Sequence, residues 1–125
     1  MIPVLLVAAG GALGAVARYL VGMLMVRRLG TSWPYATLFI NLTGCFFIAL
    51  FLTAATERIP SLNGGWRYFF PVGFVGAYTT FSTYEYEIMK LVELRQLLPA
   101  FGYFAASNIL GFGAVLLGAR LARAL

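Results

Sequence analysis

The sequence has no histidine, one cysteine and few charged residues. Without histidine, the chain lacks the commonest general base and metal ligand of proteins. Cys45 cannot form an intrachain disulfide, and it lies in an apolar run, where it is expected to pack as a small hydrophobic side chain. Only 10% of the residues are charged and 62% are hydrophobic, whereas a soluble domain has about a quarter of its residues charged. The composition therefore excludes a soluble protein.

Acidic residues are also scarce, so that the net charge is +5. The nine basic residues form no patch, which argues against a nucleic-acid partner, and they cluster between apolar runs, as expected at the headgroups of a lipid bilayer. The first apolar run has no basic flank and no clear cleavage site, so it is interpreted as a membrane span and not as a signal peptide.

Four segments are long and apolar enough to span a bilayer, which takes about 20 residues. They cover residues 3–26, 33–56, 66–94 and 97–119. The connection between the last two is short, which predicts an antiparallel helical hairpin. The chain shows no internal repeat, and we expect a single all-α transmembrane domain.

The third segment contains an unusual stretch, GFVGAYTTFSTYEYE, at residues 73–87. Two glycines, three threonines and a serine fall at bilayer depth, where hydroxyl groups can satisfy backbone groups freed by a break in the helix. Irregular backbone at that depth is tolerated only inside protein or beside a water-filled cavity. The stretch predicts a helix that is broken mid-membrane and lines something polar. The alternative is a face of small residues that packs against a neighbouring helix.

Two other polar residues lie inside apolar segments. Arg18 either extends to the interface or anchors a loop or a broken helix, and we favour the anchor because intramembrane charges usually have a partner. Asn41 either bonds a neighbouring helix or donates hydrogen bonds into an ion path. Gly10 and Gly14 are four residues apart, so they share a helix face and predict a close helix–helix approach.

Basic residues are balanced between the two ends of the four spans. Without Arg18, four lie on the side of the termini and four on the other: Arg58, Arg67, Arg120 and Arg123 against Arg27, Arg28, Lys90 and Arg95. The positive-inside rule therefore selects no orientation. Chance could explain the balance. We favour insertion in both orientations, followed by assembly of an antiparallel dimer that supplies an inverted repeat.

The side chains at depth favour transport over catalysis. The sequence shows no paired carboxylates at depth, no phosphate-binding loop, and no serine or cysteine beside a base. What remains is an amide, hydroxyl groups and aromatic rings, whose edges are electropositive. This inventory suits a small, strongly hydrated anion.

The chain resembles the Fluc/CrcB family of fluoride channels. The resemblance covers all four spans and rests on three blocks: Gly10-Gly11…Gly14-Ala15…Arg18-Tyr19, Ala36-Thr37-Leu38…Asn41…Gly44, and Gly73-Phe74-Val75-Gly76-Ala77-Tyr78-Thr79-Thr80-Phe81-Ser82-Thr83-Tyr84. It implies an antiparallel homodimer in the inner (plasma) membrane, with two pores that let fluoride leave the cytoplasm passively and so relieve its toxicity.

The resemblance also implies roles for particular residues. Asn41 would be the pore amide and Phe81 the first pore phenylalanine, while Ser82 and Thr83 would belong to a polar track beside the rings. Tyr84 stands where the family usually has a second phenylalanine, which leaves open whether its ring edge or its hydroxyl meets the anion.

By the same resemblance, the backbone carbonyls of Gly76 and Thr79 from both subunits would bind a structural sodium ion at the dimer axis. Arg18 matches the family's first-helix arginine, with a structural role. Glu85 replaces a residue that is commonly small and polar, and a carboxylate at the mouth would repel anions unless it is paired or turned away. Glu87 matches a glutamate often found in the family.

Two other functions remain as alternatives. A small proton-coupled multidrug-type exporter also has four spans and dual orientation, but it depends on an embedded glutamate in the first helix, where this chain has Arg18 and no acidic residue. A non-transporting assembly subunit would need no polar groups converging at mid-bilayer.

Overall fold

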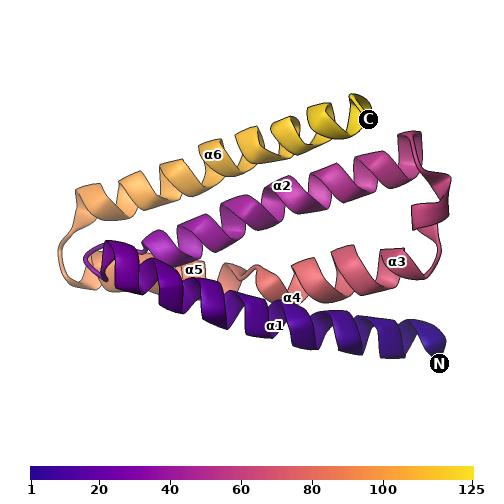
Figure 1. The fold of residues 1–125 in the computed structure, drawn as a ribbon. Coiled ribbons are helices and arrows are strands. Elements are labelled where there is room, and N and C mark those ends of the chain that lie inside the picture. Colours follow the sequence, from indigo (N-terminus) through magenta and orange to yellow (C-terminus); the bar gives the residue numbers. More distant parts are fainter.

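The computed structural model describes all 125 residues, and every regular element is helical. The elements in chain order are α1 (Ile2–Leu29), α2 (Tyr35–Glu57), η1 (Pro60–Asn63), α3 (Gly65–Arg67), η2 (Tyr68–Val75), α4 (Gly76–Tyr78), α5 (Phe81–Glu93) and α6 (Leu97–Arg123). In Figure 1, α6 runs along α2, α1 runs along η2 and α4, and the two termini lie at the same end.

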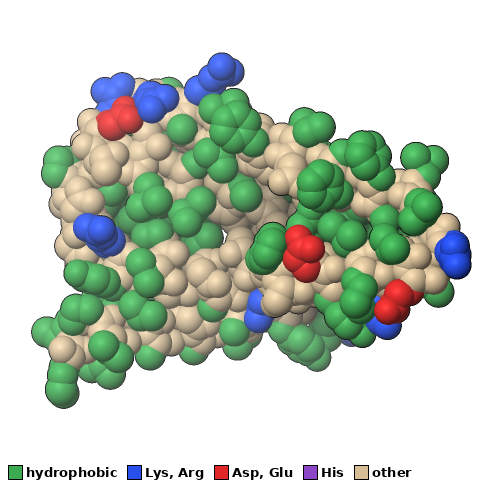
Figure 2. Space-filling model, turned by 180° about the vertical axis from the view of Figure 1, so that it is seen from behind, with side chains coloured by type: hydrophobic (Ala, Val, Ile, Leu, Met, Phe, Trp, Pro, Cys, Tyr) green, Lys and Arg blue, Asp and Glu red, His purple; other side chains and the backbone are tan.

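The exterior of the protein is largely apolar. Only 18 of the 125 residues are buried, and long apolar side chains on every long helix are exposed. Figure 2 shows these side chains along the whole length of one face, with the basic side chains mainly toward its ends. Because α1, α2 and α6 are each long and apolar enough to cross a membrane, the protein is a multi-pass membrane protein whose outer surface suits lipid or another apolar partner.

Glycine determines how closely α1 approaches the third segment. A Cβ atom at Gly10 would overlap the carbonyl oxygen of Phe69, and one at Gly14 would overlap that of Phe74. From the other side, a Cβ at Gly73 would lie 2.8 Å from the carbonyl oxygen of Val7. The close approach predicted from Gly10 and Gly14 is therefore confirmed, and Gly73 belongs to the same packing face.

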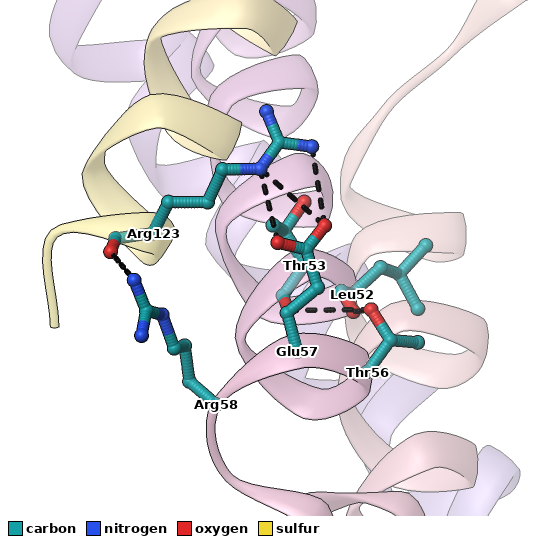
Figure 3. Close-up of polar contacts among 6 residues, drawn as sticks. All are labelled: Leu52, Thr53, Thr56, Glu57, Arg58 and Arg123. Atoms are coloured by element: carbon teal, nitrogen blue, oxygen red, sulfur yellow. Dashed lines mark hydrogen bonds and ion pairs between the residues drawn. The ribbon is translucent and has the colours of Figure 1, made fainter.

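At the end that carries both termini, ionic contacts join α2 to α6 (Figure 3). Arg123 donates through Nε to Oε2 of Glu57 at 3.0 Å and through Nη2 to Oε1 at 3.1 Å. Arg58 donates to the carbonyl oxygen of Arg123. These groups are exposed, so the ion pair between Arg123 and Glu57 contributes little to stability, and the contacts join the last turns of the two helices.

The helices differ from the expected spans at their ends. α1 continues through Arg27 and Arg28, and α6 continues to Arg123, because a helical backbone need not stop where the apolar run stops. α2 begins at Tyr35, two residues after the start of the expected span at residue 33, and Pro34 is its N-cap.

The third segment is a series of short elements. Pro71 has no N–H to donate, and it lies inside η2, whose wide turns are of the π-helical type. Between α4 and α5 the backbone is extended, with φ −83° and ψ 161° at Thr79 and φ −151° and ψ 118° at Thr80. The helical hydrogen-bond ladder stops at this point.

Candidate functional site

Asn41 on α2 pairs with the extended backbone between α4 and α5. The Thr80 N–H, which in a continuous α-helix would donate to the carbonyl oxygen of Gly76, donates instead to Asn41 Oδ1 at 2.9 Å. Asn41 Nδ2 in turn donates to the carbonyl oxygen of Thr80 at 2.9 Å. One carboxamide thus replaces two backbone partners and still has a second N–H to donate.

Small and hydroxyl side chains support the same turn. Gly44, one helical turn beyond Asn41, leaves room for the Thr79 methyl group, which a Cβ at position 44 would overlap. Thr80 is the N-cap of α5, and its hydroxyl oxygen accepts from the Thr83 N–H at 3.3 Å. Arg18 on α1 places Nη1 3.5 Å from the Thr79 carbonyl oxygen. Three elements therefore contribute contacts that hold the interruption.

An open pocket of about 360 Å³ lies beside the interruption, between α2, α5 and α6. Its lining contains no charged side chain. It consists of Asn41, Gly44, Cys45, Ile48, Val75, Thr79, Thr80, Phe81, Tyr84, Ser107 and Asn108. We call this space the amide pocket, because two carboxamides, those of Asn41 and Asn108, line it together with hydroxyl groups and aromatic rings.

The aromatic residues of the amide pocket differ strongly in exposure. Phe81 is 73% exposed, whereas Tyr84 is only 6% exposed. Their ring centroids are 5.8 Å apart with planes tilted by 41°. Tyr84 also meets Tyr103 of α6 edge to face, with centroids 5.1 Å apart. The Tyr84 ring is therefore held by its neighbours, while most of the Phe81 ring is free to contact lipid or a second protein surface.

A second open pocket, of about 450 Å³, lies on the other side of the same turn. Arg18 and Arg27 line it together with Thr80 and Thr83, and no carboxylate does. We call this the arginine pocket. Thr80 lines both pockets, so the turn that Asn41 holds borders both a hollow lined by two arginines and one lined by no charged side chain.

The carboxylate of Glu87, next to these pockets, is fully engaged. Its Oε1 accepts from the Thr37 hydroxyl at 2.8 Å, and its Oε2 accepts from the Tyr103 hydroxyl at 2.7 Å. Glu85, by contrast, is exposed and lines neither pocket. No carboxylate thus enters either hollow.

The structure places the residues singled out from the sequence in different surroundings. Asn41, Phe81 and Tyr84 meet in the amide pocket, Thr83 faces the arginine pocket, and Ser82 is exposed and lines neither. Thr79 lies at the interruption, and Gly76 is exposed one turn before it.

Asn108 was not assigned to the site from the sequence. The signal was available, because Asn108 is a lone carboxamide inside an apolar segment, as Asn41 is.

The chain is similar to known proteins over nearly its whole length. The family model described as "CrcB-like protein, Camphor Resistance (CrcB)" matches residues 5–119. A protein of Acidobacterium capsulatum is 52% identical over 112 residues, which are 90% of this chain and 89% of that relative. A protein of Caulobacter sp. is 43% identical over 123 residues, 98% and 96% of the two chains, and one of Chloroflexus aurantiacus is 42% identical over 120 residues, 96% and 94%. All three relatives are named fluoride-specific ion channel FluC.

Proposed function

Since the chain belongs to the CrcB family, we propose that it is a fluoride channel that lets the anion leave the cytoplasm passively. Fluoride enters cells as neutral HF and dissociates in the more alkaline cytoplasm, so an exit for the ion relieves its toxicity. The family is one of ion channels, not of enzymes.

The observation that carries the proposal is the lining of the amide pocket. A small anion leaving water needs hydrogen-bond donors and the positive edges of aromatic rings, and it is repelled by carboxylates. Asn41, Phe81, Tyr84 and Asn108 supply such groups in one place, and no acidic residue lines that place. None of them is charged, which suits conduction, because an ion must also leave each site easily.

The arginine pocket supplies the first attraction. Arg18 and Arg27 raise the local concentration of anions, as a hollow lined by one sign of charge does. From there an anion passes the Thr80 turn, where Thr83 offers a hydroxyl, and reaches the amide pocket. In this scheme Ser82 continues the track on the exposed side of α5.

The assembly that we propose is an antiparallel homodimer with two pores in the inner membrane. Four spans at residues 3–26, 33–56, 66–94 and 97–119 would cross the bilayer, with the third broken mid-membrane at Thr79–Thr80. The balance of basic residues supports insertion in both orientations. The exposure of the Phe81 ring supports a second copy that covers it and completes each pore.

A sodium ion at the dimer axis would stabilise the two interrupted segments. Gly76 fits a ligand role because its carbonyl oxygen has lost its helical donor to Asn41, and its residue is exposed. Thr79 fits less simply, because its carbonyl oxygen also lies near Arg18, but a carbonyl has two lone pairs and the contact is long. Each copy offers two oxygens, so a second copy is needed to complete the set.

The test is efflux from liposomes loaded with fluoride, with chloride-loaded liposomes as the control. Passive fluoride flux that needs no proton gradient is the expected result. Flux of an organic cation driven by protons would instead identify a multidrug-type exporter, which no finding favours because α1 has no acidic residue. Absence of any flux would leave an assembly subunit.

A further inference from the structure

The contact between Asn108 of α6 and Tyr84 of α5 has a direction that its neighbours determine. Asn108 Nδ2 lies 2.8 Å from the carbonyl oxygen of Phe104 and 3.3 Å from the Tyr84 hydroxyl oxygen. A carbonyl oxygen only accepts hydrogen bonds, so the Phe104 contact identifies the amide nitrogen. The second N–H of that nitrogen is then the donor to Tyr84.

The hydroxyl proton of Tyr84 must therefore point away from Asn108. The Tyr84 oxygen accepts from the amide, and the hydroxyl donates to no group of the chain. The nearest tyrosine does not compete, because the Tyr103 hydroxyl donates to Glu87. Edge-to-face contact with Tyr103 also restrains the Tyr84 ring. Tyr84 thus brings to the amide pocket a hydroxyl whose proton is donated to no acceptor of the chain.

We propose that the Tyr84 hydroxyl, oriented by Asn108, donates a hydrogen bond directly to the permeating anion in the amide pocket. Asn108 is the positioning residue, and the anion meets an O–H donor at Tyr84 where a phenylalanine would present only a ring edge. A hydroxyl that accepts from an amide is also a stronger donor, because hydrogen bonds in a chain polarise one another. The proposal rests on the proposed fluoride conduction and concerns how tightly the ion is held on its way.

The experiment is a double-mutant cycle read as the fluoride concentration that gives half-maximal flux in liposomes. Tyr84→Phe keeps the ring and is expected to keep the maximal flux. It should raise the half-maximal concentration about tenfold, the effect of losing one hydrogen bond to a charged group. Asn108→Leu, which keeps a similar side-chain volume, should also raise the half-maximal concentration. In the Tyr84→Phe background, Asn108→Leu should add less than about twofold, because the two residues act through one hydroxyl.

Tyr86→Phe is the matched control, since Tyr86 lies on the same helix, is exposed and does not line the amide pocket. It should leave the half-maximal concentration unchanged. An unchanged value in Tyr84→Phe, or an equal effect of Asn108→Leu in both backgrounds, would overturn the proposal while leaving fluoride conduction intact. If Asn108→Leu does not fold, the half-maximal concentration of Tyr84→Phe alone tests the proposal. Absence of fluoride flux in the unaltered protein would instead refute the proposed function.

Discussion

Asn41 is the residue whose loss should do most damage for its size. Asn41→Leu keeps the volume of the side chain but removes both hydrogen bonds to Thr80, one through each end of the carboxamide. The N–H and C=O groups of Thr80 then lose these two hydrogen bonds, while the Thr79 N–H keeps its bond to the carbonyl oxygen of Val75. Water can replace the asparagine only in part, because Thr80 is half-buried.

The expected cost follows from the two groups left without partners. A buried polar group without a hydrogen bond costs about 1–3 kcal/mol. Partial exposure of Thr80 places each group in the lower part of that range, so the total loss is about 2–4 kcal/mol. That loss corresponds to about a 30- to 1000-fold change in the equilibrium for opening the turn. Asn41→Asp should lose less stability, because a carboxylate still accepts from the Thr80 N–H, but it should abolish fluoride flux by repelling the anion.

Amide hydrogen exchange at Thr80 in detergent measures the local effect, and denaturant unfolding followed by Trp33 and Trp66 fluorescence measures the global one. Exchange at Thr80 in Asn41→Leu should accelerate by about the same 30- to 1000-fold, and flux should be lost. Asn63→Leu is the matched control, because Asn63 also donates to one backbone carbonyl, that of Ala55 at 2.7 Å, far from the site. Asn63→Leu should lower the free energy of unfolding by about 1 kcal/mol and leave fluoride flux unchanged. If Asn41→Leu behaves like Asn63→Leu in both measurements, the reasoning about the interruption is wrong.

Four further outcomes are expected. Phe81→Ile keeps apolar bulk but loses the electropositive edge, so a dimer should persist on size exclusion while fluoride flux is nearly lost; near-normal flux would make Phe81 a packing residue. Two lysines added at Asn63–Gly64 should bias every copy to one orientation and abolish flux, which co-expression with an oppositely biased copy should restore; full activity of the biased copy alone would exclude the antiparallel dimer. Thr79→Ala should still bind sodium, because only its carbonyl is used, and an experimental structure with no ion on the axis would contradict the site. Arg95 has φ 59° at the end of α5, so Arg95→Gly should be more stable than Arg95→Ala by about 1 kcal/mol in denaturant unfolding, and equal stabilities would argue against strain there.

Local chemistry along the chain was enough to predict several features. Apolar runs of spanning length predicted α1, α2 and α6, since hydropathy is a property of consecutive residues. The spacing of Gly10 and Gly14 predicted a close helix contact, because residues four apart share one face of a helix whatever lies opposite. The family also followed from local motifs, and comparison with relatives confirmed it.

Packing between distant segments brings particular polar groups together. Asn41 and Thr80 are 39 residues apart, and only the packing of α2 against the third segment brings the carboxamide to the extended backbone. The same packing places Thr83 and Tyr84, which are adjacent in sequence, in different pockets. It also pairs Tyr84 with Asn108, from a helix whose own sequence does not reveal which face it turns inward. Two groups from distant segments form a hydrogen bond only when their positions are right to within a few tenths of an ångström. These positions follow from how all the helices pack together.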